Sequence, residues 1–422
     1  MCYYKINTLL IIIQHILQYC KSFRKESDIL AIAGIVAEFN PLHNGHKHLI
    51  DCAKKDGNTV VCVISGNFVQ RGDTAVIPKF RRAEAALSAG ADIVIELPVP
   101  WSMSTAQNFA LGAMSQLKAF NISSLYFGSE AADVDMLLKT SDLLCTADFN
   151  EKIRAKLKNG ETFAKSRYDV ISSMLDKECS VLDTPNDTLA VEYINAAKKL
   201  NMSIAYQPIK RIGADHDQAI TSSENFASSS LLRKYITDNN FASVKGFLPN
   251  FSYEITVNSP ISSISHIDNA ITAVLKRLNN EDFKKLPDIS EGIENLIYEN
   301  VHSATDFNEL CMAVKSKRYT LARVRRLLLS AFLGIDNRYF LTEPPYVRIL
   351  GMSEQGAKAI KKNPTKQIVT RASEIRSSGT EVQELFELEN RINELYALSL
   401  DEPKRFLNES SERIICKHHS SK

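Results

Sequence analysis

The sequence LAIAGIVAEFNPLHNGHKHL, which spans Leu30–Leu49, gives the clearest indication of the fold. Residues 30–37 are apolar and rich in isoleucine and valine, which is typical of a buried strand. The cluster Glu38–Pro41 then breaks the strand, and apolar residues return at helical spacing after the histidines. We therefore expect a strand, a tight loop and a helix that begins near His43 and His46.

Such a helix start can hold a nucleotide phosphate. The first N–H groups of a helix have no partner within it and attract an anion. Gly45 lets the anion approach the backbone, while His43 and His46 add imidazole donors. The spacing resembles the H-x-G-H motif of the nucleotidyltransferase superfamily, whose members make an adenylate from ATP. A loop histidine is more often a surface residue, so other segments must point to the same site.

The composition is that of a globular protein. A chain of 422 residues exceeds one ordinary core, so we expect two domains. The net charge of +2 implies that any nucleic-acid surface is a local basic patch. None of the eight cysteines forms a C-x-x-C pair, so we expect reduced thiols in a cytoplasmic protein without a zinc or redox motif.

Residues 1–29 read as an extension ahead of the true domain. The apolar patch near residues 9–17 is interrupted by Gln14 and His15 and falls well short of the ~20 residues that span a bilayer. No small-residue cleavage site follows it. A membrane-surface helix is the alternative, and we expect deletion of residues 1–28 to leave activity intact.

Strand-like and helical segments alternate in the first half. Further apolar runs lie at 59–64, 92–98, 124–127 and 203–209. This alternation predicts a parallel sheet wound on both faces, in which ligands bind beyond the carboxyl ends of the strands. The loops that hold the two histidines, residues 65–73 and Gly128 all leave from those ends. Their agreement favours a shared site.

Three later segments add polar groups at the same edge. Asn186 lies at a helix start, where it either caps the helix or reaches a ligand. Arg211 follows a strand, and its guanidinium suits a phosphate or a nucleobase carbonyl, with a plain exposed arginine as the alternative. Serines 228–230 open another helix with Arg233 one turn in, which predicts a second anion cradle. This segment resembles the I-S-[ST]-[ST]-x-x-R motif that closes the nucleotidyltransferase core.

Six segments together resemble one family, the bacterial tRNA(Met) cytidine acetate ligases. They are GIVAEFNPLHNGH, ISGNFVQRGD, ADIVIELP, FGSE, TPND and KRIGADH. The resemblance implies that acetate and ATP form acetyl-adenylate and pyrophosphate. The acetyl group would then pass to N4 of the wobble cytidine, C34, of elongator tRNA(Met). We therefore expect an α/β fold with a Rossmann-like (HUP-type) parallel-sheet nucleotidyltransferase domain at 30–238. A C-terminal α-helical tRNA-binding domain would follow at 239–422.

The resemblance also assigns the ATP site. The residues that it implies, together with the second cradle, are Val36, Ala37, Glu38, Phe39, Asn40, Pro41, Leu42, His43, Asn44, Gly45, His46, Lys47, His48, Leu49, Gly128, Asn186, Arg211, Ser229 and Arg233. We expect catalytic His43 and His46, with the Gly45 and His46 amides, to stabilise charge on the α-phosphate. Arg233 would hold the leaving pyrophosphate, and Mg²⁺ would bridge phosphates without a protein metal site. Asp187 departs from the family pattern, so its role is open.

After about residue 239, helical periodicity replaces the strand-like runs. The segment 315–329 predicts a helix with most of its cations outward. We expect it to contact tRNA phosphates, with Tyr319 stacking on a base, through Lys317, Arg318, Arg323, Arg325 and Arg326. The alternative is an ordinary solvated face. A second basic cluster comprises Lys358, Lys361, Lys362, Lys366 and Arg371.

Two other functions stay open at the level of sequence. One is an adenylyltransferase that acts on a small phosphorylated metabolite, which would need no large basic helical domain. The other is a non-catalytic tRNA-binding protein with a nucleotide pocket, which would not need the histidines or the serine–arginine motif. All versions of the enzyme require His46 and Arg233 to reach the same ligand.

Overall fold

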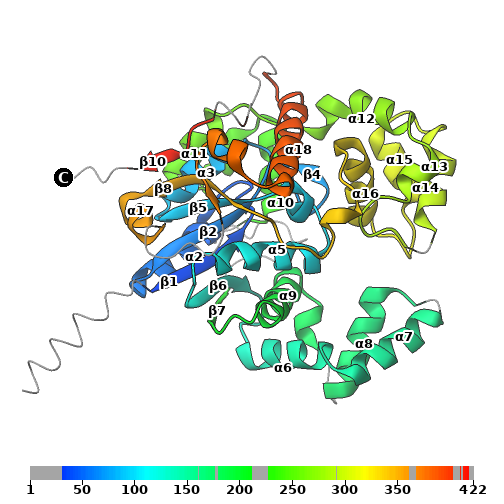
Figure 1. Cartoon of the computed structure of the whole chain (residues 1–422), viewed down its shortest axis with the longest axis horizontal. Helices are drawn as coiled ribbons and strands as arrows, with labels where there is room; N and C mark the ends of the chain where they lie inside the picture. The colour runs from blue at the N-terminus through cyan, green and yellow to red at the C-terminus, as the bar shows by residue number, and fades with distance from the viewer. Residues whose placement is uncertain are drawn as a thin grey trace, which may run out of the picture.

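The computed structural model describes residues 31–159, 161–175, 179–211, 227–290, 292–360, 367–402, 409 and 412–417. A mostly parallel sheet lies at its centre, and helices cover both faces (Figure 1). The strand order is β10-β8-β5-β2-β1-β6-β7, and β9 pairs with β8. The predicted N-terminal extension and Lys361, Lys362 and Lys366 lie outside the described residues.

Five strands form the parallel core, as the sequence predicted. They are β1 (Ile32–Ala37), β2 (Thr59–Ser65), β5 (Ile93–Leu97), β6 (Ser124–Ser129) and β7 (Ala205–Lys210). Alternate residues of β2 pack on opposite faces, with Cys62 toward one hydrophobic cluster and Val63 toward the other. Burial of both faces explains why these strands read as continuous apolar runs.

Four helices cover the parallel core directly. On one face lie α2 (Asn44–Lys55) and α3 (Lys79–Ser88), and on the other α5 (Ala106–Lys118) and α9 (Pro185–Lys199). The short helix α4 (Val99–Ser102) follows β5. Between β6 and α9 the chain inserts three helices that the sequence analysis did not predict, namely α6 (Val134–Leu144), α7 (Ala147–Lys158) and α8 (Phe163–Leu175). They lie at one side of the sheet (Figure 1).

The second half is mainly helical. Its helices are α10 (Ser229–Thr237), α11 (Asn250–Val257), α12 (Asp268–Leu275), α13 (Asn280–Phe283), α14 (Ile293–Val301), α15 (Phe307–Val314), α16 (Leu321–Leu333), α17 (Glu354–Ile360) and α18 (Thr380–Ala397). It also contributes β8 (Val347–Ser353), β9 (Ile368–Val369) and β10 (Ile415–Lys417), which the sequence analysis did not predict. β8 pairs with β5 in the antiparallel orientation, so the two halves of the chain share one sheet.

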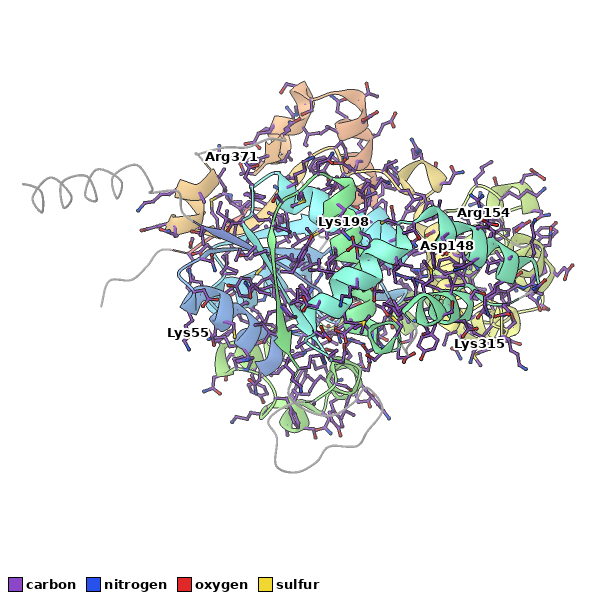
Figure 2. The ribbon with its side chains drawn as sticks, turned by 90° about the horizontal axis from the view of Figure 1, so that it is seen from below. Lys55, Asp148, Arg154, Lys198, Lys315 and Arg371 are labelled. Atoms are coloured by element: carbon purple, nitrogen blue, oxygen red, sulfur yellow. The ribbon has the colours of Figure 1, made fainter. Side chains whose placement is uncertain are left out.

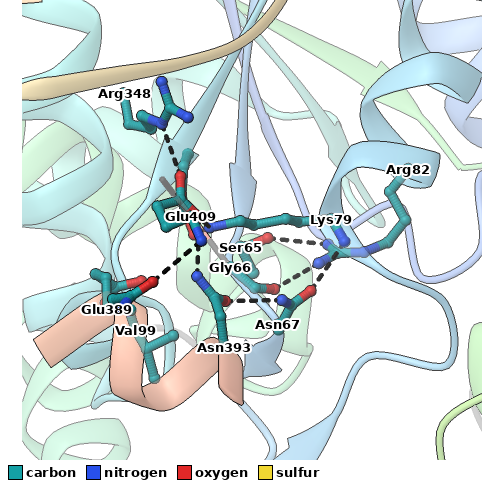
Figure 3. A network of polar contacts seen from close by, with 12 residues as sticks. Ser65, Gly66, Asn67, Lys79, Arg82, Val99, Arg348, Glu389, Asn393 and Glu409 are labelled. Atoms are coloured by element: carbon teal, nitrogen blue, oxygen red, sulfur yellow. Dashed lines mark hydrogen bonds and ion pairs between the residues drawn. The ribbon is translucent and has the colours of Figure 1, made fainter. Parts of the chain in front are cut away.

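A buried polar network joins the sheet to the C-terminal segment (Figure 3). Lys79 Nζ lies 2.7 Å from carboxylate oxygens of both Glu96 and Glu409. Glu409 also pairs with Arg348 Nε of β8 at 2.7 Å. Burial alone would lower the pKa of Lys79, but the two glutamates raise it above its ordinary value. The lysine is therefore charged and paired, as a buried charge requires.

Candidate active site

A pocket of about 260 Å³ opens at the carboxyl ends of β1, β6 and β7. It is lined by most of the predicted ATP-site residues, namely Val36, Ala37, Glu38, Asn40, His43, Gly45, His46, His48, Leu49, Gly128, Asn186, Arg211, Ser229 and Arg233. His46 and Arg233 thus lie in the same pocket, although they are far apart in sequence. This is the juxtaposition that a nucleotidyltransferase requires.

The remaining predicted ATP-site residues are not among those that line the pocket. They are Phe39, Pro41, Leu42, Asn44 and Lys47. Phe39 and Leu42 are buried, and the Phe39 ring packs edge-on against His46 at 5.0 Å between centroids. The Asn44 side chain donates to the Gly246 carbonyl at 3.1 Å. Phe39, Leu42 and Asn44 therefore shape the loop that presents the histidines, whereas Lys47 lies within α2 and pairs with Asp51.

Beneath the pocket, one buried arginine fixes the chain where two strands end. Arg82 of α3 donates to the carbonyl oxygen of Glu38 at 2.8 Å. It also donates to the carbonyl oxygens of Ser65 at 2.9 Å and of Gly66 (Figure 3). The loops that leave β1 and β2 are therefore held by the same guanidinium. A planar group with several donors suits this task better than a lysine would.

His43 is the N-cap of α2. Its Nδ1 accepts hydrogen bonds from the backbone N–H groups of Gly45 at 3.1 Å and His46 at 3.4 Å. A ring nitrogen that accepts these bonds carries no proton, so the proton of the neutral ring is on Nε2. Burial, reinforced by the charges of Arg211 and Arg233, lowers the pKa of His43 to about 3. The ring is therefore neutral at physiological pH.

The first backbone N–H groups of α2 already have partners. The Asn44 amide donates to the Phe247 carbonyl at 2.9 Å, and those of Gly45 and His46 donate to His43. In this structure the Gly45 and His46 amides, which the sequence predicted to face the anion, are bonded to the histidine N-cap, and their role toward an anion stays a prediction. The His46 ring and side chains from other elements that line the same pocket are further groups that can meet an anion.

His46 stacks on His43. The ring centroids are 3.7 Å apart with an interplanar angle of 17°. Burial, followed by the charges of His43 and Arg211, lowers the pKa of His46 well below its ordinary value. Two neutral imidazoles can stack at this distance, whereas two imidazolium ions would repel. The two uncharged rings can therefore offer hydrogen-bond donors to a ligand.

The serines at the start of α10 have separate partners. Ser228 caps the helix by accepting the Leu231 N–H at 3.3 Å. Ser229 Oγ lies 3.1 Å from His43 Nε2, which carries the proton and donates. Ser230 Oγ accepts from Arg233 Nη2 at 3.0 Å. Because only Ser228 serves as the cap, the other two are available to build the site.

At the far end of the pocket, residues after β6 and β7 meet. Asn186 donates a hydrogen bond to Glu130, and Arg211 Nε lies 3.9 Å from the same carboxylate. Asp187 is buried, bonds Ser129 and accepts from the Ala131 N–H at 3.0 Å. Asp187 therefore fastens the end of β6 to the start of α9, which answers the question that the sequence left open.

The pocket also contains residues that the sequence analysis did not assign to it. These are Gln70, Arg71, Phe109, Pro185, Leu189, Tyr193, Ile209, Lys210, Ala227 and Ser230. Gln70 and Arg71 belong to the polar loop that the sequence placed at the sheet edge. The loop was recognisable from its position after a strand, but its sequence does not show which side chain turns toward the pocket.

The predicted tRNA-binding residues fall into two groups. Lys317 and Arg318 are exposed just before α16, near Lys315, which lies on the same side of the molecule as Arg154 of α7 (Figure 2). Three arginines of α16 contact neighbouring segments of the protein. Arg323 pairs with Asp288 at 3.2 Å, while Arg325 and Arg326 donate to backbone carbonyls of the loop after β2.

Two details of that prediction are corrected by the structure. Most of the α16 cations do not simply point outward, because their guanidinium groups bind carbonyl and carboxylate oxygens of neighbouring segments. Tyr319 is only 7% exposed, and the Arg323 guanidinium lies 5.8 Å from its ring centre. The ring is therefore not placed to stack on a base.

The fold and this pocket define a nucleotidyltransferase of the H-x-G-H class. The family described as "HIGH Nucleotidyl Transferase" matches residues 30–411. Within that class, the chain belongs to the tRNA(Met) cytidine acetate ligase family, which is a family of ligases. No helix within the described ranges is long and apolar enough to cross a membrane.

Several relatives show the family. The tRNA(Met) cytidine acetate ligase of Caldanaerobacter subterraneus subsp. tengcongensis is 37% identical over 87% of this chain and 94% of the relative. That of a Thermoanaerobacter species is 34% identical over 88% and 96%. The crystal structure of Thermotoga maritima TmcAL bound with alpha-thio ATP has a TM-score of 0.84 at 27% identity. It covers 92% of this chain and 100% of the TmcAL chain.

Proposed function

We propose that this protein is a tRNA(Met) cytidine acetate ligase. A carboxylate oxygen of acetate attacks the α-phosphorus of ATP, and the bond to the diphosphate breaks. N4 of the wobble cytidine, C34, of elongator tRNA(Met) then attacks the acetyl carbon of the adenylate. AMP leaves, and N4 loses one proton to water. The observation that carries this proposal is the meeting of His43, His46 and Arg233 in one pocket of a chain from this family.

The geometry suggests how the first step is catalysed. Acetate and ATP are both anions, so charge that develops on the α-phosphate must be stabilised. The neutral rings of His43 and His46 would supply N–H donors, while Arg233 would hold the departing diphosphate. Adenosine would lie toward Gly128, Asn186 and Arg211 at the other end. Acetate is already ionised, so this step needs no general base.

We also propose that Mg²⁺ binds together with ATP. The described segments contain no group of three or more His, Cys, Asp or Glu residues that could hold a metal ion. Mg²⁺ commonly binds through substrate phosphates and waters with few protein ligands. When bound, it would neutralise phosphate charge.

For tRNA, we retain exposed Lys317 and Arg318 as phosphate contacts. A tRNA substrate would place the protein in the cytoplasm. Replacing both residues with glutamate should weaken tRNA binding and its dependence on salt, while ATP–pyrophosphate exchange stays normal. Equal loss of both activities would show that the substitutions damage the fold instead.

One assay tests the function. The protein is incubated with ATP, labelled acetate and a tRNA(Met) transcript, and the nucleosides are analysed after nuclease digestion. We expect labelled N4-acetylcytidine, and none from a transcript with uridine at the wobble position. His46→Ala should lose at least about a hundredfold in acetate-dependent pyrophosphate exchange. Exchange that depends on a phosphorylated metabolite would indicate the adenylyltransferase instead, and no exchange at all would indicate the non-catalytic binder.

A further inference from the structure

The loop after β2 brings an arginine into the pocket. Its short strands β3 (Phe68–Val69) and β4 (Asp73–Thr74) form a hairpin whose tip carries Gln70 and Arg71. Both side chains line the pocket. Arg71 Nη1 donates to Ser230 Oγ at 3.2 Å, and the same hydroxyl accepts from Arg233 at 3.0 Å. Two guanidinium groups thus meet at one hydroxyl.

This pair of guanidinium groups fits an anion with several charges. Burial lowers the pKa of Arg233, the Glu38 carboxylate raises it, and the charge of Arg71 lowers it again. Two cations that share one neutral hydroxyl repel each other, and a bound anion would reduce this repulsion further than the Glu38 and Asp73 carboxylates do alone. Arginine is also the side chain whose fork geometry best matches phosphate oxygens.

Helix α16, in the second half of the chain, contacts this hairpin tip. Arg325 Nε donates to the Gly72 carbonyl at 2.8 Å, and its Nη2 lies 3.2 Å from Asp73. Arg326 Nη1 donates to the Gln70 carbonyl at 3.3 Å. These contacts flank Arg71 on both sides in sequence. The backbone on either side of Arg71 is therefore fixed by α16.

We propose that Arg71 binds the polyphosphate of ATP together with Arg233, and that Arg325 and Arg326 are positioning residues that hold Arg71 in place. The inference rests on the proposed function and adds residues to the same site. It also links the half of the chain that would bind tRNA to the half that would form the adenylate.

Polyphosphate fits this place better than acetate does. The hairpin follows β2, whereas the residues expected to hold adenosine lie in β6, at the start of α9 and after β7, and both of these strands are on the other side of β1. The triphosphate would therefore extend from the nucleoside end toward Arg71. Acetate carries a single charge, whereas the diphosphate that leaves carries several, which suits two guanidinium groups.

The first test measures ligand binding and kinetics of Arg71→Ala in the full-length chain. We expect ATP affinity, measured by calorimetry, to fall about ten- to a hundredfold, as for a lost charge-assisted contact. The KM for pyrophosphate in the exchange reaction should rise similarly, while the KM for acetate should stay within about twofold. Arg71→Lys should recover part of the loss. An unchanged ATP affinity, or a rise confined to the KM for acetate, would overturn the proposal.

The second test asks whether α16 acts through Arg71. Arg325→Ala should weaken ATP binding in the same direction, and the double variant Arg71→Ala/Arg325→Ala should be no worse than Arg71→Ala alone. Effects that simply add would show that Arg325 does not position Arg71. Arg338→Ala is the matched control, because this exposed arginine also pairs with Asp336 and Glu384 but lies outside the pocket.

These measurements separate the inference from the proposed function. ATP affinity does not depend on which acid is activated, so a wild-type chain that binds ATP but ignores acetate contradicts only the proposed reaction. A wild-type chain that is active with acetate, together with an Arg71→Ala variant that binds ATP normally, contradicts only the role of Arg71. The melting temperature of each variant, if unchanged, shows that the fold is intact.

Discussion

At the scale of single residues, His43 serves the fold and the chemistry with different ring atoms. Nδ1 caps α2, while Nε2 reaches Ser229 in the pocket. The sequence predicted this histidine as a ligand-binding residue from the motif and from its place after a strand. It did not predict the cap, since histidine is not among the preferred N-cap residues.

Replacement of His43 by asparagine should separate its two tasks. Asparagine is a good N-cap, so His43→Asn should retain stability to within about 1 kcal/mol, whereas His43→Ala should lose about that amount or more. Both variants lose the Nε2 donor, so both should lose about a hundredfold or more in pyrophosphate exchange. Urea unfolding and the exchange assay check this. Equal stability of the two variants would show that the cap contributes little.

The depressed histidine pKa values predict acid sensitivity. Between about pH 3 and the ordinary value of 6.5, the unfolded chain takes up a proton at His43 that the folded chain excludes. The unfolding free energy should therefore fall as the pH decreases through this window, by up to about 1.4 kcal/mol per pH unit for each such histidine. Urea unfolding at several pH values should show a shallower loss for His43→Asn than for wild type. His302→Asn, at an exposed position, should match wild type.

At the scale of elements, the parallel core was predictable because each strand is a continuous apolar run that ends in a breaker. The strand β8 was missed because Arg348 and Gly351 interrupt its apolar pattern. Arg348 is tolerated there because Glu409, 61 residues away in sequence, pairs with it in the core. A pairing over this distance leaves no local signal. The same holds for Arg71, whose partners Ser230 and Arg233 come from a distant helix.

The contact between the β3–β4 hairpin and α16 depends on a glycine. Gly72 has a φ of +73°, and a Cβ atom there would lie 2.7 Å from Arg325 Cβ and 2.8 Å from Arg326 N. Gly72→Ala should therefore cost about 2 kcal/mol or more of stability and should also weaken ATP binding, because the hairpin must move away from α16. Calorimetry and urea unfolding check both effects.

Gly334 provides the matched control for this substitution. It has the same φ of +73° at the C-terminus of α16, but a Cβ atom there would meet nothing within 4 Å in the described structure. Gly334→Ala should show only the cost of the left-handed backbone, about 1 kcal/mol, with normal ATP binding. Equal losses in the two variants would mean that the close approach to α16 has no energetic consequence.

At the scale of the whole molecule, the C-terminal segment belongs to the core. Glu409→Gln removes a charge that lies 2.7 Å from both Lys79 and Arg348, all of them buried. We expect a loss of about 3–5 kcal/mol in unfolding free energy, because two buried cations lose a shared partner. Glu384→Gln, which breaks an exposed pair with Arg338, should cost at most about 1 kcal/mol. A small effect of Glu409→Gln would indicate that the network rearranges around the amide.

The antiparallel pairing of β5 with β8 also has a consequence while the protein is being made. When β5 leaves the ribosome, β8, which covers its edge, is still untranslated, because Val347 lies far beyond Leu97 in the chain. At a translation rate of about 5–20 residues per second, this edge stays unpaired for roughly tens of seconds. An open, apolar strand edge invites pairing with other nascent chains. A holdase chaperone that binds Ile93–Leu97 during this interval would raise the yield of folded protein but would not change the stability of the native state.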